Sequence, residues 1–566
     1  MKIKKIGLII IVFTIFSLWG CGKNTIKTNS ELNKNDSEQY ISIILKDEPQ
    51  ILDPSKSTDR YSSQILFEVN ESLTRVEEDK NGKNIVKPAG AERWEVSPDQ
   101  LKWTFYLRDN QWSDGKKVTA KDYEYGIKRT LDPTIKSQNA FLLYPIKGAK
   151  EHNLLETNKS SNISSNKLGV RALDDKTLEI TLESPCGYFL KLTSYKIMQP
   201  QRKDIVEKYG DKYGTEVNTL VFNGPFLIKQ WTHNKELELI KNNSYWDAKS
   251  VKLEKIIMKI EKNDIDIMNE FLNDSLDLVG GLSPEWNNKL NKKNEIDILK
   301  VEEPSINCEI YNQSNKIFNN PKVRKAFSLA VDREVISKDL WKGLYVPAYG
   351  WVPPSVQIGE EYFREKANFE PIKELKKEYP DAKKLLIEGL KELGMEADTS
   401  KITISYLQAG ADINQRNIAE FFQKMYCKNL GINLKIEYVD YPVFQKRISS
   451  GEYQLASIVW TGDYNDPSAE LNLWVASAGV IPTGWSNSIY DSLVGKANSI
   501  GVNGNEERFE AFKEAENILV LKDAVISPIV YKNRQILKYK YVKGIMTPLF
   551  GPDVELKYAY TSGRNN

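Results

Sequence analysis

Histidine and cysteine are scarce in this chain of 566 residues. There are two histidines, His152 and His233, and four cysteines, and no C-x-x-C pair occurs. Structural zinc sites are built from clusters of these ligands, so we expect no such site, no tightly held transition metal and no cofactor. Cys308 and Cys427 could form a disulfide in an exported protein, and their spacing leaves this open.

Catalytic motifs and an excess of charge are also missing. No G-x-S-x-G, no H-E-x-x-H and no histidine-based triad pattern occurs, so we expect no enzyme. A secreted hydrolase remains a remote alternative, because 77 acidic residues offer many carboxylate pairs. The 79 basic residues leave a net charge of +2 without a basic tract, which provides no field for nucleic acid or an anionic membrane.

The amino terminus has the pattern of an export signal. Lysines precede the apolar run Ile6–Trp19, which is too short to span a bilayer comfortably. The run ends in Leu18-Trp19-Gly20-Cys21, which resembles a bacterial lipobox and implies cleavage before Cys21 and lipid on its sulfur. We therefore predict a signal peptide at 1–20 and a polar, flexible tether at 21–39. A short membrane anchor with an incidental cysteine is the alternative.

Apolar periodicity in the body of the chain predicts a mixed α/β protein. Ile41–Leu45, Lys102–Arg108 and Thr177–Leu182 have the alternation of half-buried strands. Between Ile402 and Trp460 the pattern reads strand, helix, strand, helix, strand. That order favours parallel strand pairs with right-handed crossovers, and 40% hydrophobic residues are enough for two large lobes.

The last of these strands delivers an acid to a turn. Ala456–Trp460 is apolar, Asp463 follows three residues later, and the turn-forming sequence Asn465-Asp466-Pro467 comes next. Ligand crevices in open α/β sheets lie at the carboxyl ends of strands, so Asp463 is a candidate binding residue. An ordinary strand-to-loop exit with a solvated acid is the alternative.

Eight short strings in the chain keep the order that they have in one known family. The sequence resembles the cluster 5 extracytoplasmic solute-binding lipoproteins, of the oligopeptide-binding type that feeds ABC importers. The strings are LDP (52–54), WTFYLRDNQWSDGKKVTAKDY (103–123), TLEITLESP (177–185), NGPF (223–226), YW (245–246), NPKVRKAFSLAVDRE (320–334), PAYGWVPP (347–354) and WTGDYNDP (460–467).

This resemblance implies a fold of two lobes around a cleft, the type II periplasmic-binding-protein-like fold, with an extra subdomain in lobe one. Lobe one is expected at 40–302 plus 534–566, with the subdomain at about 60–200, and lobe two at 303–533. The chain is expected to cross between the lobes near Glu303-Pro304 and near Asn533.

The resemblance also implies the site. The acid that matches Asp463 pairs with the α-ammonium of a peptide in the family, and the backbone of the preceding strand binds the peptide in extended form. Expected peptide-binding residues are Val459, Trp460, Thr461, Gly462, Asp463, Glu48, Tyr441 and Tyr531.

Two departures from the family pattern concern the same strand. Ser457 stands where some peptide binders place an arginine for the ligand carboxylate, so carboxylate recognition is unassigned. Thr461 stands where some have a cysteine, so that family disulfide is absent.

The expected partners are an oligopeptide, permease subunits and a lipid anchor on the outer face of a bacterial membrane, with the protein a monomer. Other cargo on the same fold, such as a nickel chelate, haem or an oligosaccharide, is an alternative, although two isolated histidines disfavour nickel. A surface peptide receptor that does not transport is another alternative, and sequence cannot separate it from a transporter subunit.

Overall fold

The computed structural model describes residues 35–80, 82–155, 167–280, 286, 290 and 293–564. The predicted signal peptide, Cys21 and most of the predicted tether lie outside the described residues. Within the described part of the chain, no helix is long and apolar enough to cross a membrane.

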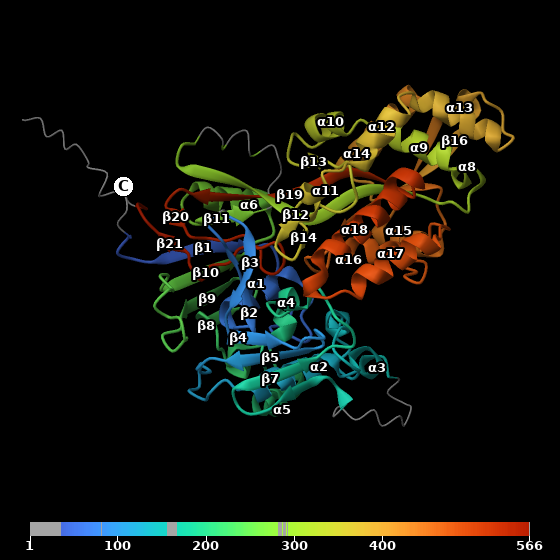
Figure 1. Cartoon of the computed structure of the whole chain (residues 1–566). Coiled ribbons are helices and arrows are strands. Elements are labelled where there is room, and N and C mark those ends of the chain that lie inside the picture. The colour runs from blue at the N-terminus through green and yellow to red at the C-terminus, as the bar shows by residue number, and fades with distance from the viewer. Residues whose placement is uncertain are drawn as a thin grey trace, which may run out of the picture.

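One large mixed sheet runs through the molecule and joins its two lobes (Figure 1). Its strands are, in order across the sheet, β17 (Asn433–Val439), β16 (Thr403–Ala409), β18 (Leu455–Thr461), β12 (Ile296–Tyr311), β19 (Ile526–Tyr539), β11 (Leu278–Gly280), β1 (Tyr40–Leu45), β10 (Lys255–Ile260), β9 (Glu236–Lys241) and β8 (Phe226–Thr232), and β13 (Val346–Pro347) pairs with β19 off this path.

The two lobes have separate hydrophobic cores. In lobe one, helix α1 (Arg60–Val69) packs with β1 and β8–β10, and α6 (Asp264–Leu272) lies between β10 and β11 in the chain. In lobe two, β16 is parallel to both β17 and β18, which confirms the parallel pairs expected from the strand–helix alternation. The helices of lobe two are α8 (Lys316–Asn319), α9 (Pro321–Ala330), α10 (Arg333–Val335), α11 (Phe363–Ala367), α12 (Pro371–Glu378), α13 (Ala382–Glu392), α14 (Ile413–Leu430), α15 (Tyr441–Ser450), α16 (Ser468–Leu471), α17 (Ser488–Asn498) and α18 (Asn505–Glu516).

A subdomain with its own core lies below lobe one in Figure 1. It contains the antiparallel sheet β4-β5-β7-β6 (Ala91–Val96, Lys102–Leu107, Thr177–Thr181 and Val170–Ala172), helix α2 (Ala120–Leu131) and the short helix α4 (Phe189–Leu192). Strands β2 (Thr74–Glu78) and β3 (Asn84–Pro88) form a hairpin in the chain before it.

Capping residues fix the starts of two helices. The side-chain oxygen of Asn320 accepts hydrogen bonds from the backbone N–H groups of Lys322 (2.8 Å) and Val323, and Pro321 is the first residue of α9. The backbone N–H of Thr119 donates to the Asp122 carboxylate at 2.9 Å, and these two residues form a capping box at the start of α2.

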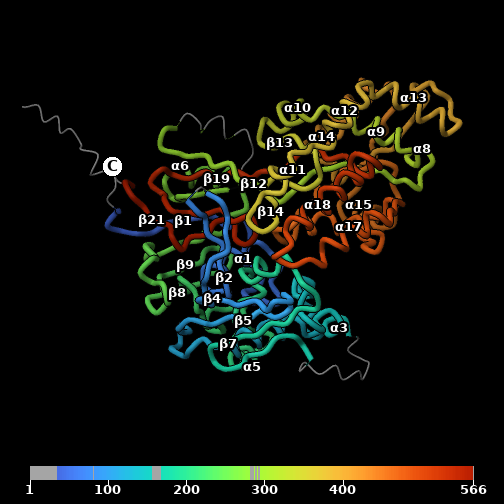
Figure 2. The backbone as a smooth tube through the Cα atoms, in the orientation of Figure 1, coloured from blue at the N-terminus to red at the C-terminus, as the bar shows by residue number. Residues whose placement is uncertain are grey.

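Two long strands, β12 and β19, pass from one lobe to the other (Figure 2). They pair from Ile296↔Tyr539 to Glu302↔Asn533 in lobe one, and again from Ile306↔Tyr531 in lobe two. Between these two runs β12 has three residues, 303–305, where β19 has one, 532. Pro304 lies in this irregular stretch, where its missing N–H disrupts no ladder hydrogen bond. The crossing therefore combines continuous strands with a local irregularity.

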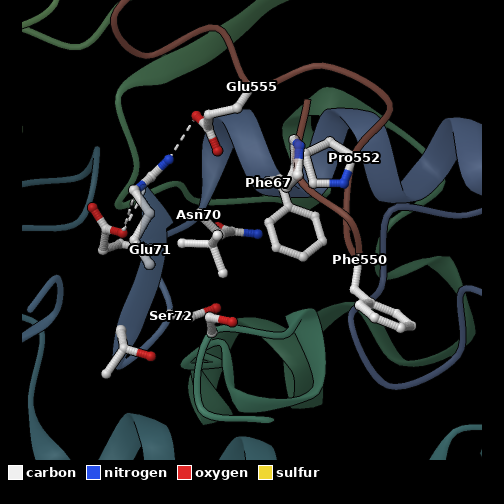
Figure 3. Close-up of a pocket in the computed structure, with 12 residues that line it drawn as sticks. Phe67, Asn70, Glu71, Ser72, Phe550, Pro552 and Glu555 are labelled. Carbon is white, nitrogen blue, oxygen red and sulfur yellow. Dashed lines mark hydrogen bonds and ion pairs between the residues drawn. The ribbon is translucent and has the colours of Figure 1, made fainter. Parts of the chain in front are cut away.

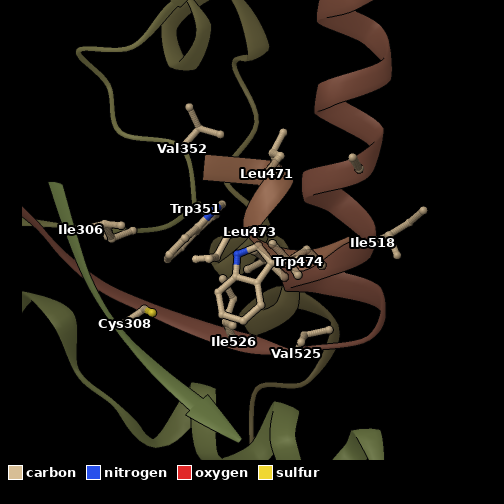
Figure 4. Packing of buried hydrophobic residues seen from close by; sticks show 14 of the residues in the cluster. Ile306, Cys308, Trp351, Val352, Leu471, Leu473, Trp474, Ile518, Val525 and Ile526 are labelled. Carbon is tan, nitrogen blue, oxygen red and sulfur yellow. The ribbon is translucent and has the colours of Figure 1, made fainter. Parts of the chain in front are cut away.

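The core of lobe two covers the face of these strands at the crossing (Figure 4). The rings of Trp351 and Trp474 meet edge to face with centroids 5.4 Å apart. The indole N–H of Trp351 donates to the backbone carbonyl of Glu470 at 3.0 Å, which satisfies its polar atom inside the core. Cys308 is buried here and Cys427 is exposed, and both thiols are free.

Two expected elements have different bounds in the structure. Helical spacing predicts a helix from Ile65 to Leu73, whereas α1 begins at Arg60 and ends at Val69. Its start is fixed by the Asp59 side chain, which accepts a hydrogen bond from the backbone N–H of Ser62 at 2.7 Å. The apolar run Val525–Tyr531 predicts a strand, whereas β19 extends from Ile526 to Tyr539 because it pairs with β12 in both lobes.

Candidate functional site

Strand β18 has an unpaired edge next to the crossing strands. On one side it pairs with β12 along its whole length, from Leu455↔Tyr311 to Thr461↔Ser305. On the other side only Leu455 and Ala456 pair with β16. In the described chain, residues 457–461 thus have one strand neighbour, and Val459 among them is 52% exposed. Such an edge can accept an added strand.

The turn after β18 is held against the crossing strand β12. The hydroxyls of Thr461 and Ser305 are 2.6 Å apart, and the backbone N–H of Gly462 donates to the carbonyl of Pro304 at 2.8 Å. A Cβ at Gly462 would lie 2.4 Å from a carboxyl oxygen of Glu470, so a larger residue here would force that buried carboxyl group to move. Trp460 packs on the core of lobe two. The position of the next residue, Asp463, is therefore tied to the lobe crossing.

The carboxylate of Asp463 has no partner within the described residues. It makes no hydrogen bond or ion pair there, and the residue is exposed. The protein atoms around it still exclude enough water to raise the pKa of this carboxyl. This carboxylate is therefore available to bind a cationic group.

Asp466, three residues further on, is in the opposite situation. Both of its oxygens accept hydrogen bonds from one terminal nitrogen of Arg508, at 2.7 and 2.8 Å, and neither side chain has any exposed surface. Arg508 also donates to the carbonyl of Ala497 at 3.1 Å. A Cβ at Gly187 of the subdomain would lie 2.3 Å from this guanidinium, which makes the contact glycine-dependent. Asp466 therefore holds the turn in place, and this role was missed by the sequence interpretation.

The subdomain touches lobe two beside Asp463. Lys191, in α4, donates to the backbone carbonyls of Gln357 at 2.9 Å and Asn465 at 2.8 Å, and burial lowers its pKa to about 7. The rings of Tyr188 and Tyr464 stack with centroids 4.2 Å apart. Nothing in the sequence pattern of this segment indicates a contact with lobe two, because the two partners come from separate domains.

The other three expected residues lie in different surroundings. Glu48 accepts hydrogen bonds from the Trp231 indole N–H (3.0 Å), from His233 (2.7 Å between its Nδ1 and the carboxylate) and from the Asn234 backbone N–H (2.8 Å). Its carboxylate is thus occupied by the β8–β9 hairpin.

The two tyrosines differ in access to solvent. Tyr441 is 60% exposed at the start of α15, whereas Tyr531 is 6% exposed. The Tyr531 hydroxyl donates to the carbonyl of Gly350 at 2.9 Å and accepts from the N–H of the same residue. Tyr441 is available to a ligand as it stands, and the Tyr531 hydroxyl is not.

At least three cavities lie between the lobes, and two of them have room for a small ligand. One, of about 280 Å³, is lined by Trp94, Leu190 and Lys191 of the subdomain and by Gln357 and Asn465 of lobe two. The other, of about 390 Å³, lies along the crossing strands and is lined by the end of β1, the start of α1, Trp341–Tyr345 and residues 532–536. Both have the size of small-ligand sites.

Another pocket is too small for a solute. Figure 3 shows the rings of Phe67 and Phe550 on one side of it and the carboxylates of Glu71 and Glu555 on the other. Its volume is about 20 Å³, room for about one water molecule. Arg75 pairs with Glu555 at 2.6 Å and with Glu71 at 3.1 Å. This buried cluster joins α1, β2 and the carboxyl-terminal segment and is a structural feature.

Metal-ligating side chains do not cluster in the described ranges, where no group of three or more His, Cys, Asp or Glu residues could hold an ion. The features available for binding are an unpaired acid and an open strand edge at β18, an exposed tyrosine at the start of α15, and the cavities between the lobes.

Comparison with known proteins gives consistent matches along the whole chain. Residues 86–481 match the model of the bacterial extracellular solute-binding proteins, family 5. The oligopeptide-binding protein OppA of Bacillus subtilis is 32% identical over 98% of this chain and 98% of its own length.

Two solved structures represent different states. The murein tripeptide-binding protein MppA in its unliganded open form is 25% identical, with a TM-score of 0.77 over 93% of this chain and 98% of its own. Listeria monocytogenes OppA bound to peptide is 28% identical, with a TM-score of 0.68 over 93% of this chain and 99% of its own.

Proposed function

The chain belongs to the bacterial extracellular solute-binding proteins of family 5, and on that premise we propose that it captures oligopeptides between its lobes and delivers them to an ABC importer. The observation that carries this proposal is the unpaired Asp463 carboxylate beside the open edge of β18. A peptide offers an ammonium group for the acid and backbone amides for the edge.

In the proposed mode the peptide lies extended along residues 457–461 of β18. Main-chain hydrogen bonds supply affinity without reading side chains, and Asp463 neutralises the α-ammonium. Val459, Trp460, Thr461 and Gly462 form this strand end, and Tyr441 is available to cover the ligand. Glu48 and the Tyr531 hydroxyl already have hydrogen-bond partners. They would therefore contribute to the walls of the cleft without bonding the peptide, unless closure of the lobes breaks their present hydrogen bonds.

The two lobes are arranged as in an open form. The chain superposes better on the unliganded open form of MppA, with a TM-score of 0.77, than on a peptide-bound OppA, with 0.68. An open cleft also agrees with an exposed Asp463 that has no partner. We therefore propose that ligand binding closes lobe two over lobe one through the irregular stretch at residues 303–305 and 532.

The finer expectations on domains, location and partners are part of the same proposal. Lobe two would extend from 303 to 533, with the crossings as its limits. Cys21 would carry the lipid that anchors a monomer to the outer face of the membrane, beside its permease, and the protein would have no enzymatic activity. The relatives that match are named as binding proteins, which favours peptide transport over the hydrolase and over other cargo.

A double-mutant cycle between protein and ligand tests the proposal. Asp463→Ala and amino-terminal acetylation of the peptide each delete the same ion pair, and removing one partner of a desolvated pair costs on the order of 3–5 kcal/mol. At about 1.4 kcal/mol per factor of ten, each change should weaken binding roughly a hundredfold or more, and the two losses should not add. Titration calorimetry on the four combinations measures this.

Asp440 provides a matched control for this cycle. It also lies at the carboxyl end of a strand, β17, its side chain makes no capping bond, and it is exposed. Asp440→Ala removes the same charge from the same sheet edge, two strands away. It should change peptide affinity by less than about threefold, because solvent and salt screen the effect of a charge on the protein surface. Full additivity with Asp463→Ala, or equal effects of the two variants, would remove Asp463 from the site.

A further inference from the structure

The cavity of about 280 Å³ between the subdomain and lobe two has a mainly apolar wall. Its apolar side chains come from several parts of the chain: Val76, Ile85 and Val86 of the β2–β3 hairpin, Trp94 and Leu190 of the subdomain, Val502 of lobe two, and Leu549 and Phe550 near the carboxyl terminus. An apolar cavity of about 150 Å³ is enough to bind benzene. This larger cavity therefore has room for an aromatic ring that carries a polar substituent.

Lys191 is the basic residue in the described lining of this cavity, and its charge has no counter-ion. The ammonium donates to the backbone carbonyls of Gln357 and Asn465, and it forms no ion pair in the described chain. The charges that face it cancel one another, and they belong to Lys83, Arg508, Glu360 and Asp466. A largely buried cation without a counter-ion favours an anionic ligand group beside it.

Gln357, in β14 (Gln357–Ile358), adds a second donor next to Lys191. Its backbone N–H donates to Asn465 Oδ1 at 2.8 Å, and its side-chain oxygen accepts from Asn465 Nδ2 at 3.0 Å. Its Nε2 has no hydrogen-bond partner in the part of the chain that the structure describes, although the residue is only 2% exposed. A buried donor without an acceptor is costly, so a ligand oxygen at this place would be stabilising.

We propose that this cavity binds a small carboxylic acid with an apolar body, whose carboxylate accepts hydrogen bonds from Lys191 and from Gln357 Nε2. Hydrogen bonds from an ammonium to a carboxylate are among the strongest in proteins. The apolar body would pack on Trp94, Leu190 and Phe550, which line the same cavity. No residue of β18 is among the described residues of this wall, so the site is separate from the strand edge proposed for the peptide.

The charge state of Lys191 gives this site a pH dependence. Burial lowers the pKa of Lys191 to about 7, so the ligand-free protein carries the ammonium below about pH 7 and loses it above. A carboxylic acid with an ordinary pKa near about 4 stays ionised throughout this range. Because the carboxylate favours the ammonium form, its affinity should be full below about pH 7 and should fall roughly tenfold or more by about pH 9.

The test is a calorimetric titration of the protein with 2-naphthoate and with 2-naphthamide, which has nearly the same shape but no charge. At about pH 6 the wild type should bind the acid roughly 30-fold or more tightly than the amide, and Lys191→Met should lose this preference. The amide should change by less than about threefold in Lys191→Met. Ile85→Trp fills the cavity from the hairpin without touching the charge, and it should weaken both compounds.

Lys196→Met is the matched control. Lys196 follows Lys191 in the same segment, burial lowers its pKa to about 8, and it donates to the Ser63 hydroxyl at 2.7 Å. It is not among the described residues that line the cavity. Its removal should therefore change the affinity for either compound by less than about threefold.

Several results would overturn the proposal. They are no binding of the acid by the wild type, equal affinities for acid and amide, an acid preference that survives Lys191→Met, and an acid affinity that does not change with pH. Unchanged binding in Ile85→Trp would place the acid elsewhere and have the same consequence. If Lys191→Met does not fold, Ile85→Trp and the pH profile still decide the outcome.

The peptide cleft is tested separately. The acid should bind Asp463→Ala as it binds the wild type, and a peptide should not displace it. Displacement by a peptide, or loss of the acid in Asp463→Ala, would assign the acid to the peptide cleft and overturn the second site. Failure of the Asp463 cycle with peptides would overturn the proposed function and leave this site unaffected.

Discussion

Asp466→Asn should destabilise the protein strongly and Asp463→Asn hardly at all, although the two acids lie three residues apart. The Asp466 carboxylate holds Arg508, and neither side chain has exposed surface. Asparagine has the same shape and can still accept from the Ser468 hydroxyl, which donates to Asp466 at 2.7 Å. The substitution therefore removes the charge and little else. Arg508, which already has one buried nitrogen without a partner, is left uncompensated.

The expected loss follows from that burial. Breaking a buried pair by removing one partner costs about 3–5 kcal/mol. For a lobe of roughly 230 residues, 1 kcal/mol shifts the melting temperature by about 2–4 °C, so Asp466→Asn should lower it by roughly 6–20 °C. Asp463→Asn loses no partner and should stay within about 1 °C. Differential scanning calorimetry of the soluble domain, without peptide, measures both.

A third variant separates charge from shape. Asp466→Asn combined with Arg508→Met removes both partners and should recover most of the loss, because no buried charge is left without its counter-ion. The reasoning is refuted if Asp466→Asn has the same melting temperature as Asp463→Asn. It is also refuted if the double variant is less stable than Asp466→Asn alone.

The remaining predictions concern a buried acid in β12 and the membrane anchor. Burial raises the pKa of Glu309 to about 8. Tyr426 donates a hydrogen bond to one of its carboxyl oxygens, and the other oxygen has no partner in the described chain. The folded state therefore keeps a proton on Glu309 that the unfolded chain loses above about pH 4.5. Wild-type stability should therefore fall between about pH 4.5 and 8, and Glu309→Gln should gain on the order of 3 kcal/mol over it by pH 7, but nothing at pH 4, in urea titrations. Cys21→Ser should move the mature protein from the membrane to the soluble fraction; unchanged retention with an unshifted mass would count against lipidation.

Local chemistry made much of the fold predictable. Alternating apolar residues locate β5 and β7, and the Asn320-Pro321 start of α9 follows from capping alone. The length of β19 was not predictable, because Lys532, Asn533 and Arg534 interrupt its apolar pattern at the lobe crossing. The strand continues there only because β12, from more than two hundred residues earlier in the chain, pairs with it.

The candidate site divides in the same way. Asp463 could be located as an acid after an apolar strand, but the sequence does not show that Arg508 pairs with Asp466 while Asp463 has no partner in the described chain. Glu48 has the same charge and a similar loop setting, yet its partners Trp231 and His233 come from a distant hairpin. Sequence gives the positions of such acids, whereas tertiary contacts decide which of them remain unpaired.

The unpaired carboxylate of Asp463 would account for ligand-dependent closure in the proposed mode. Closing an empty cleft over Asp463 would withdraw water from this carboxylate without supplying a counter-charge, at a cost of several kcal/mol. The ammonium of a peptide supplies that counter-charge, so the peptide would bind the closed arrangement better than the open one. A ligand shifts a conformational equilibrium only by its differential affinity for the two states. The side chain proposed to bind the peptide ammonium would therefore also hold the empty protein open.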